Sequence, residues 1–244
     1  YDDFWQYDPA SNTWTQKANF GGTARWIAAS FSIGNKGYIG SGNDLTGNTN
    51  DLWEYDPSLN TWTQKSNCPG APRCSAIGFA IGNKGYICMG TDFLSDFSDV
   101  WEFDPATNAW TQKANFAGPA RYTSIGFSVN NMGYVGTGWT SATSGPINDF
   151  WQYDPAINTW TQKANFGGPI RCEATCFTLC NRGYVGTDTN IVSTTSRNDI
   201  WEYDPINDTW TPVANYGGGP GEVATAFSIG SKAYLGTGWC GPTS

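Results

Sequence analysis

The chain has 244 residues, of which 39% are hydrophobic and only 14% charged, and its formal net charge is −8. An acidic chain with 13 lysines and arginines lacks the basic patch that a phosphate backbone requires, so we expect no nucleic-acid partner. The lack of histidine excludes Ser-His-Asp and Cys-His catalysis and every histidine-ligated metal site, and we predict no metal and no cofactor. No apolar run approaches the roughly 20 residues of a transmembrane helix, so we expect no membrane insertion.

In chain order, the first recurring element is a strand-turn-strand unit with two tryptophans. The first tryptophan recurs at steps of 48 or 50 residues, and the second follows it nine residues later. The pairs are Trp5 and Trp14, Trp53 and Trp62, Trp101 and Trp110, Trp151 and Trp160, and Trp201 and Trp210. An Asp-Pro turn stands between the two strands of each unit, and proline fixes φ there at a value that suits the turn.

The other half of each repeat is a second recurring element. The stretch Phe31-Ser-Ile-Gly-Asn-Lys-Gly-Tyr returns, with small changes, from Phe79, Phe127, Phe177 and Phe227. Glycine and asparagine supply the positive φ of a tight turn at little cost, so this element is also a hairpin. Each repeat therefore predicts four strands, which in the first complete repeat cover residues 26–33, 37–40, 51–55 and 62–65.

The chain opens with strands three and four of a repeat and closes with strands one and two. We predict an all-β fold, with residues 1–244 forming one five-bladed β-propeller of four-stranded antiparallel blades. The ring is expected to close by pairing of the N-terminal strands three and four with the C-terminal strands one and two. The predicted blades cover about residues 23–68, 71–116, 119–166, 169–216, and 219–244 together with 1–20.

The repeats resemble those of the kelch family. The stretch from Tyr7 to Trp14, Tyr-Asp-Pro-x-x-Asn-Thr-Trp, and the tyrosine after the Gly-Asn turn, Tyr38, match its signature. One departure is that the family's double glycine after strand two reads Gly40-Ser-Gly42 here. The resemblance implies a propeller that serves as an interaction scaffold. Because kelch propellers more often have six or seven blades, a five-unit fragment of a longer array is the alternative.

We place the functional face where the loops vary from repeat to repeat. These loops join strand four to strand one and strand two to strand three, and variable loops on a rigid scaffold commonly carry binding. Four of the six arginines stand there at the start of strand one, namely Arg25, Arg73, Arg121 and Arg171. Guanidinium groups bind carboxylate, sulfate or phosphate, so we expect an arginine ring at the tunnel mouth for an anionic ligand. The alternative is that each arginine pairs with an aspartate or a carbonyl group of its own blade.

Other candidate ligand-binding residues break the repeat symmetry on the same face. They are Trp26 and Tyr122, which could stack a sugar or aromatic group, Glu173 and Glu222, and the two tryptophans that extend past strand two, Trp139 and Trp239. The glutamates could act in acid–base chemistry or bind a hard cation with Asp188, or each could answer a neighbouring arginine. The aspartate before strand three, which recurs in all five repeats, is interpreted as a turn cap. Among the seven cysteines, Cys68 and Cys74 could form a disulfide, and Cys176 is interpreted as a small buried filler.

Three classes of function follow. We favour a non-catalytic scaffold that holds a protein segment, an acidic peptide or a glycan at the tunnel mouth. The first alternative is a structural or consensus-like repeat unit without a small-molecule ligand. The second is a non-redox carbohydrate-active lyase or epimerase that uses Glu173, Glu222, Tyr122 and the arginine ring. We expect a monomer and, from the abundance of Trp, Asn, Thr and Gly, an extracytoplasmic location.

Overall fold

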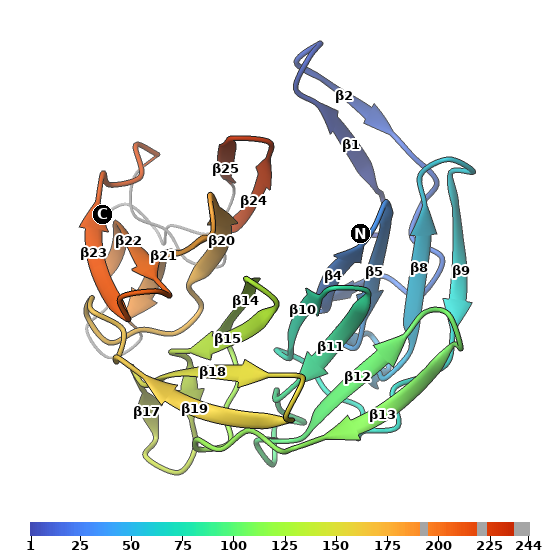
Figure 1. Ribbon diagram of the computed structural model, residues 1–244. Helices are drawn as coiled ribbons and strands as arrows, with labels where there is room; N and C mark the ends of the chain where they lie inside the picture. Colours follow the sequence, from blue (N-terminus) through green and yellow to red (C-terminus); the bar gives the residue numbers. More distant parts are fainter. Residues whose placement is uncertain (191–194, 219–223, 237–244) are drawn as a thin grey trace.

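The molecule consists of β-strands arranged as blades around a central axis (Figure 1). The structure is a computed structural model that describes residues 1–190, 195–218 and 224–236. Within these ranges no helix is long and apolar enough to cross a membrane. The predicted all-β propeller architecture is confirmed.

Four blades are complete, and in each of them four antiparallel strands follow one another from the axis outward. The first contains β4 (Ala29–Ile33), β5 (Lys36–Gly40), β8 (Leu52–Asp56) and β9 (Thr61–Lys65). The second contains β10 (Ile77–Ile81), β11 (Lys84–Cys88), β12 (Val100–Asp104) and β13 (Ala109–Lys113). The third contains β14 (Ile125–Val129), β15 (Met132–Gly136), β18 (Phe150–Asp154) and β19 (Thr159–Lys163). The fourth contains β20 (Thr175–Leu179), β21 (Arg182–Asn190), β22 (Thr195–Asp204) and β23 (Thr209–Val213).

The ends of the described chain form two separate hairpins, and short ribbons decorate the loops. The N-terminal hairpin pairs β1 (Trp5–Asp8) with β2 (Thr13–Gln16), and the C-terminal one pairs β24 (Thr225–Ile229) with β25 (Lys232–Gly236). The loop ribbons are β3 (Arg25–Trp26), β6 (Asn43–Asp44) and β7 (Gly47–Asn48) in the first blade, and β16 (Trp139–Thr140) and β17 (Gly145–Pro146) in the third.

The turns form as their residues predict. Gly34, between β4 and β5, has a φ of 59°, in the left-handed region that glycine enters without a steric penalty. Asn60, at the end of the Asp-Pro turn between β8 and β9, has a φ of 53° and accepts a hydrogen bond of 2.8 Å from the Tyr55 hydroxyl. The side chain of Asn60 therefore stabilises the turn that its backbone forms.

The core lies between blades, where aromatic rings meet glycine. Phe31 and Tyr38 stack within the first blade with ring centroids 5.0 Å apart. Phe31 then covers Gly85 of the second blade so closely that an added Cβ would lie 2.1 Å from its ring. Outer strands join through tryptophan: the Trp62 indole donates to the Ala18 carbonyl group, and the same bond recurs from Trp110, Trp160 and Trp210 to the blade before each.

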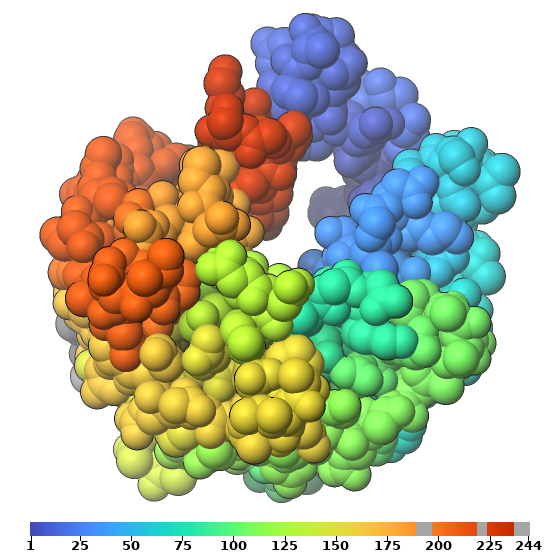
Figure 2. Space-filling model, in the orientation of Figure 1, coloured from blue at the N-terminus to red at the C-terminus, as the bar shows by residue number. Residues whose placement is uncertain are grey.

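Strand one of every repeat lines a central channel, which is open in Figure 2. Small residues at successive levels form its wall, including Ala28, Ala76, Ser124 and Gly126. Only small side chains fit where several strands converge, which explains the composition of strand one. Cys176, also part of this wall, is half-buried rather than fully buried.

The predicted ring closure does not form among the described residues. β1–β2 and β24–β25 are separate two-stranded sheets, and Figure 1 shows them facing each other across a gap. They meet through the rings of Tyr7 and Tyr234, whose centroids are 5.7 Å apart, instead of pairing edge to edge. The count of five blades therefore stays a prediction.

Candidate functional site

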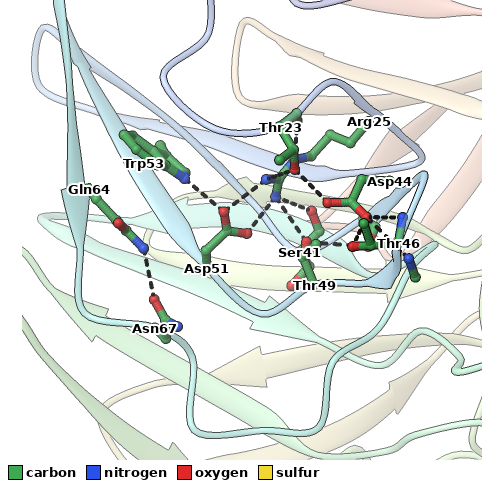
Figure 3. Close-up of polar contacts among 12 residues, drawn as sticks. Thr23, Arg25, Ser41, Asp44, Thr46, Thr49, Asp51, Trp53, Gln64 and Asn67 are labelled. Atoms are coloured by element: carbon green, nitrogen blue, oxygen red, sulfur yellow. Dashed lines mark hydrogen bonds and ion pairs between the residues drawn. The ribbon is translucent and has the colours of Figure 1, made fainter.

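An arginine at the start of strand one is held inside each complete blade, and Figure 3 shows the first of them, Arg25. In the first blade the Arg25 guanidinium donates to both carboxylate oxygens of Asp51, over 2.5 and 2.8 Å. The same carboxylate accepts a 2.8 Å hydrogen bond from the Trp53 indole, two residues further on. Arg25 also donates to the Ser41 carbonyl group and the Thr49 hydroxyl, so the group joins strand one, strand two and strand three.

The second and third blades repeat this two-oxygen pairing, and in the fourth the Arg171 guanidinium donates to one oxygen of Asp199 over 2.7 Å. The pairs are Arg73 with Asp99, Arg121 with Asp149, and Arg171 with Asp199, and these arginine side chains are at most 1% exposed. Each guanidinium also lies over a phenylalanine ring, for example that of Phe116, whose centroid is 4.7 Å from Arg121. The arginines are therefore structural clamps within the blades.

Burial and the arginines act against each other on the pKa values of the aspartates. Burial raises the pKa of Asp149, but the hydrogen bonds and charge of Arg121, together with the Trp151 indole, lower it more. The net pKa lies below the ordinary value of 3.8, and it is lowered for the same reasons in Asp51, Asp99 and Asp199. These carboxylates stay ionised in the folded state at neutral pH.

The free energy of unfolding is therefore expected to fall in acid. Between the ordinary pKa near 3.8 and the lowered pKa values, an unfolded chain binds protons at these aspartates that the folded chain does not. The contribution of the four pairs is fully present above about pH 5 and is lost as the pH falls through the lowered pKa values. Urea unfolding at a series of pH values measures this, and Asp149→Asn is expected to flatten the slope. A stability that stays constant from pH 5 to about pH 3 would contradict it.

The tunnel mouth on the loop face holds a cavity of about 440 Å³. Its wall takes residues from the start of strand one in all five repeats, with one addition from the loop after β11, Phe93. The larger side chains are Ile27, Phe93, Tyr122 and Glu173, and small residues fill the rest. Ile27, Ser75, Thr123 and Glu173 hold one equivalent position in four repeats and differ in type, so the mouth is asymmetric although the scaffold is repetitive.

A collar of backbone hydrogen bonds shapes this mouth. The Ser75 amide donates to the Ile27 carbonyl group, the Thr123 amide to Ser75, and the Glu173 amide to Thr123, over 3.0 to 3.3 Å. All four residues have a φ between 49° and 58°. Left-handed φ is unfavourable for branched residues such as Ile27 and Thr123, and it persists only where surrounding contacts enforce it. The collar therefore fixes the backbone of the mouth independently of the side chains.

The comparisons with known proteins place this architecture. Residues 1–120 match the model of the KLHDC2/KLHL20/DRC7 Kelch-repeats domain. The chain carries kelch repeats. The sequence pattern of the matched part continues beyond residue 120, and the described residues there form two more four-stranded blades and the hairpin β24–β25. A solved structure, "Structure of YjhT", is similar with a TM-score of 0.81 and 13% identity over 96% of this chain and 83% of that chain, which shows a shared fold. No match was found among the curated proteins.

In this kelch propeller the predicted arginine ring is wrong. Arg25, Arg73, Arg121 and Arg171 do not line the mouth cavity, and their guanidiniums are paired and buried. The alternative, that each arginine pairs with an aspartate of its own blade, is what the structure shows. The recurring aspartate, interpreted as a turn cap, is the partner of that arginine.

Of the aromatic candidates, Tyr122 lies in the mouth and the others lie beside it or outside the described residues. Trp26 pairs with Asn43 in the loop ribbon and is 51% exposed. Tyr122 is half-buried, exchanges backbone hydrogen bonds with Trp139, and has a pKa that burial and the nearby Asp96 carboxylate raise. Trp239 lies outside the residues that the structure describes.

The acidic candidates do not form a described pair. Glu173 lines the mouth, whereas Glu222 lies outside the described residues. Asp188, suggested as a co-ligand, does not line the mouth cavity; it is fully buried and accepts a hydrogen bond of 3.0 Å from the Arg197 guanidinium. Within the described ranges no group of three His, Cys, Asp or Glu residues is placed to hold a metal. Cys68 and Cys74 are both free thiols.

The sequence analysis missed the exposed apolar residues of the loops. Phe93 and Leu94, in the loop after β11, are 65% and 93% exposed, and Leu45, in the loop ribbon of the first blade, is 96% exposed. The usable signal was that these residues sit in loops otherwise rich in Gly, Asn, Asp, Ser and Thr. Trp26 and Ile27 are exposed as well, and of these residues Ile27 and Phe93 line the mouth cavity, so the loop face carries the exposed apolar side chains that often mark an interaction site.

Proposed function

We propose that this kelch propeller is a non-catalytic interaction scaffold that binds a segment of a partner protein at its loop face. The segment inserts an aromatic or aliphatic side chain into the mouth cavity, and its flanks rest on Trp26, Phe93 and Leu94. Support comes from the cavity of about 440 Å³, whose larger wall residues are mostly apolar. The kelch-repeat fold supports a binding role in general.

The charges at the mouth favour a neutral or basic segment over an acidic one. None of the residues that line the cavity is positively charged in the described part of the chain, and Glu173 contributes a carboxylate. The arginines on which an anionic ligand would depend are paired inside the blades. The net charge of −8 also repels acidic partners at long range.

Selection from a displayed library of random 12-residue peptides tests the proposal. We expect the selected peptides to be enriched in aromatic and aliphatic residues and depleted in Asp and Glu. The double change Phe93→Ser and Tyr122→Ser should weaken the best peptide at least about tenfold, because each removes apolar contact worth roughly 1.5–3 kcal/mol. Isothermal titration calorimetry gives the affinities.

The matched control is Ile157→Ser, which removes an exposed apolar side chain (67% exposed) from an Asp-Pro turn on the opposite face. It should leave the peptide affinity unchanged. Equal binding by the loop-face variant, or selected peptides rich in Asp and Glu, would contradict the proposal. A melting temperature shared by the two variants shows that both are folded.

A further inference from the structure

The contact between the two terminal hairpins has the geometry of a contact between neighbouring blades. Within a blade, strand-two and strand-three tyrosines occupy opposite faces, because Tyr38 is paired with Glu54 and Tyr55 with Gly37. Between blades they meet, as Tyr86 of the second blade and Tyr153 of the third do with ring centroids 5.9 Å apart. The Tyr7–Tyr234 contact, at 5.7 Å, belongs to this second kind.

The hairpin β1–β2 therefore occupies its own blade position. On its other side it joins the first blade as a complete blade does: the Trp62 indole donates to the Ala18 carbonyl group over 3.1 Å. The Ala18 amide donates to the Asn60 side chain over 2.9 Å, and the Phe4 ring packs on Tyr55 at 4.8 Å. The hairpin thus represents strands three and four of one blade, and β24–β25 represents strands one and two of the blade before it.

Three glycines mark the surfaces left open between these positions. Gly37, Gly217 and Gly236 have no heavy atom within 4 Å of an added Cβ in the described part of the chain. Their equivalents in other repeats are covered: Gly85 by Phe31, Gly167 by Trp210, and Gly136 by Phe150. By this comparison, Gly37 lacks an inner-strand phenylalanine as its neighbour, Gly217 lacks an outer-strand tryptophan, and Gly236 lacks a strand-three residue.

Two apolar cavities occupy the same places. One of about 470 Å³ lies between Tyr7 and Trp14 on one side and Phe227 and Tyr234 on the other. The other, of about 370 Å³, is lined by Phe31, Tyr38 and Trp62 of the first blade and by Phe4, which precedes β1. Trp14 is 60% exposed here, unlike the half-buried Trp62 at the equivalent position.

The lysines at the start of strand two also indicate which residues would lie opposite the open edge of β25. Lys36 and Lys84, at the start of strand two, bind the carboxylates of Glu54 and Asp104 in the strand that pairs with them. Lys232 is the equivalent residue of β25, and no ion pair of it is present among the described residues. A strand with the pattern Trp-Glu-Tyr-Asp would supply both carboxylates.

We propose that the seam, the gap between β25 and β1, is a docking site for one further kelch repeat of the same polypeptide. Its strand three pairs with β25 and its strand two pairs with β1, as β8 pairs with β5 in the first blade, and this completes a six-position ring. One period of 48 to 50 residues supplies these four strands.

The test adds that repeat to the chain. A copy of residues 49–96, fused after Ser244, contains β8 to β11 and places its first tryptophan eleven residues after Gly238, the spacing of Trp53 from Gly42. Hydrogen exchange followed by mass spectrometry reports on residues 5–8 and 232–236. In the 244-residue chain we expect these amides to exchange at least about tenfold faster than the equivalent residues 53–56 and 36–40, because one edge of each strand is unpaired.

With the added repeat, the two segments should become as protected as their equivalents, and the melting temperature should rise. The control is a fusion whose added 48 residues have the same composition in scrambled order, and it should change neither quantity. Two results would overturn the proposal: full protection of both segments in the 244-residue chain, which indicates direct five-blade closure, or unchanged exchange with the intact added repeat.

Discussion

Replacing Arg121 by alanine is expected to lower the free energy of unfolding by about 3–5 kcal/mol, as the loss of one partner from a buried ion pair does. Arg121 is fully buried and binds both carboxylate oxygens of Asp149 and the carbonyl groups of Pro119 and Thr137. Its removal leaves the Asp149 carboxylate with the Trp151 indole as its side-chain donor and without the positive charge that compensates it. Equilibrium urea unfolding, followed by tryptophan fluorescence, measures the loss.

Lys84→Ala is the matched control for Arg121→Ala. Lys84 also pairs with an aspartate, Asp104, but both side chains are more than a quarter exposed. Surface pairs of this kind contribute about 0–1 kcal/mol. Arg121→Lys should fall between the two, because an ammonium group cannot bind both oxygens and the two carbonyl groups in the plane of a guanidinium. Equal losses for Arg121→Ala and Lys84→Ala would show that the buried clamp does not stabilise the blade.

A second large effect is expected from Gly85→Ala, which should destabilise the propeller by about 1–3 kcal/mol through overpacking. The new methyl group would lie 2.1 Å from the Phe31 ring, which itself is buried between two blades and stacked on Tyr38. To relieve this overlap, the Phe31 ring must move or the two blades must separate. Differential scanning calorimetry should show a lower melting temperature.

Gly37→Ala tests the same strand position without the neighbour. Gly37 has open space around its Cα among the described residues and no positive φ, so alanine there should be neutral or stabilise by about 0.4–1 kcal/mol. The pair of variants thus separates the effect of the blade interface from that of strand propensity. A cost for Gly37→Ala as large as that for Gly85→Ala would mean that Phe227 covers Gly37 in solution, as in a closed five-blade ring.

The fold was predictable because the same residue types mark the strands and turns in each repeat. The Gly-Asn and Asp-Pro turns fix the hairpins, and the tryptophans recur at one spacing, so the predicted strands 37–40 and 62–65 lie within β5 and β9. The arrangement at the seam was not predictable. Repeats identical in sequence can place a hairpin in the same blade or in the next one, and only contacts such as Tyr7–Tyr234 distinguish the two.

Of the candidate binding residues, Tyr122 and Glu173 line the mouth cavity on the face that carries the variable loops. That this face binds a ligand stays a prediction. The direction of the arginine side chains was not predictable, because an arginine at the start of strand one can point into the tunnel or into its own blade. The usable signal was the aspartate that follows each arginine at a separation of 26 or 28 residues in four repeats, a partner that sequence reasoning assigned to the turn.

The backbone collar has a consequence for how such a protein can change during evolution. The hydrogen bonds of the collar run from amide to carbonyl group, so the collar needs no particular side chain at residues 27, 75, 123 or 173. Each repeat that gene duplication adds therefore brings one residue to the mouth, and the side chain of that residue can change without loss of the collar. Specificity can drift one repeat at a time while the rest of the ring keeps its stability, so new partners can arise without rebuilding the scaffold.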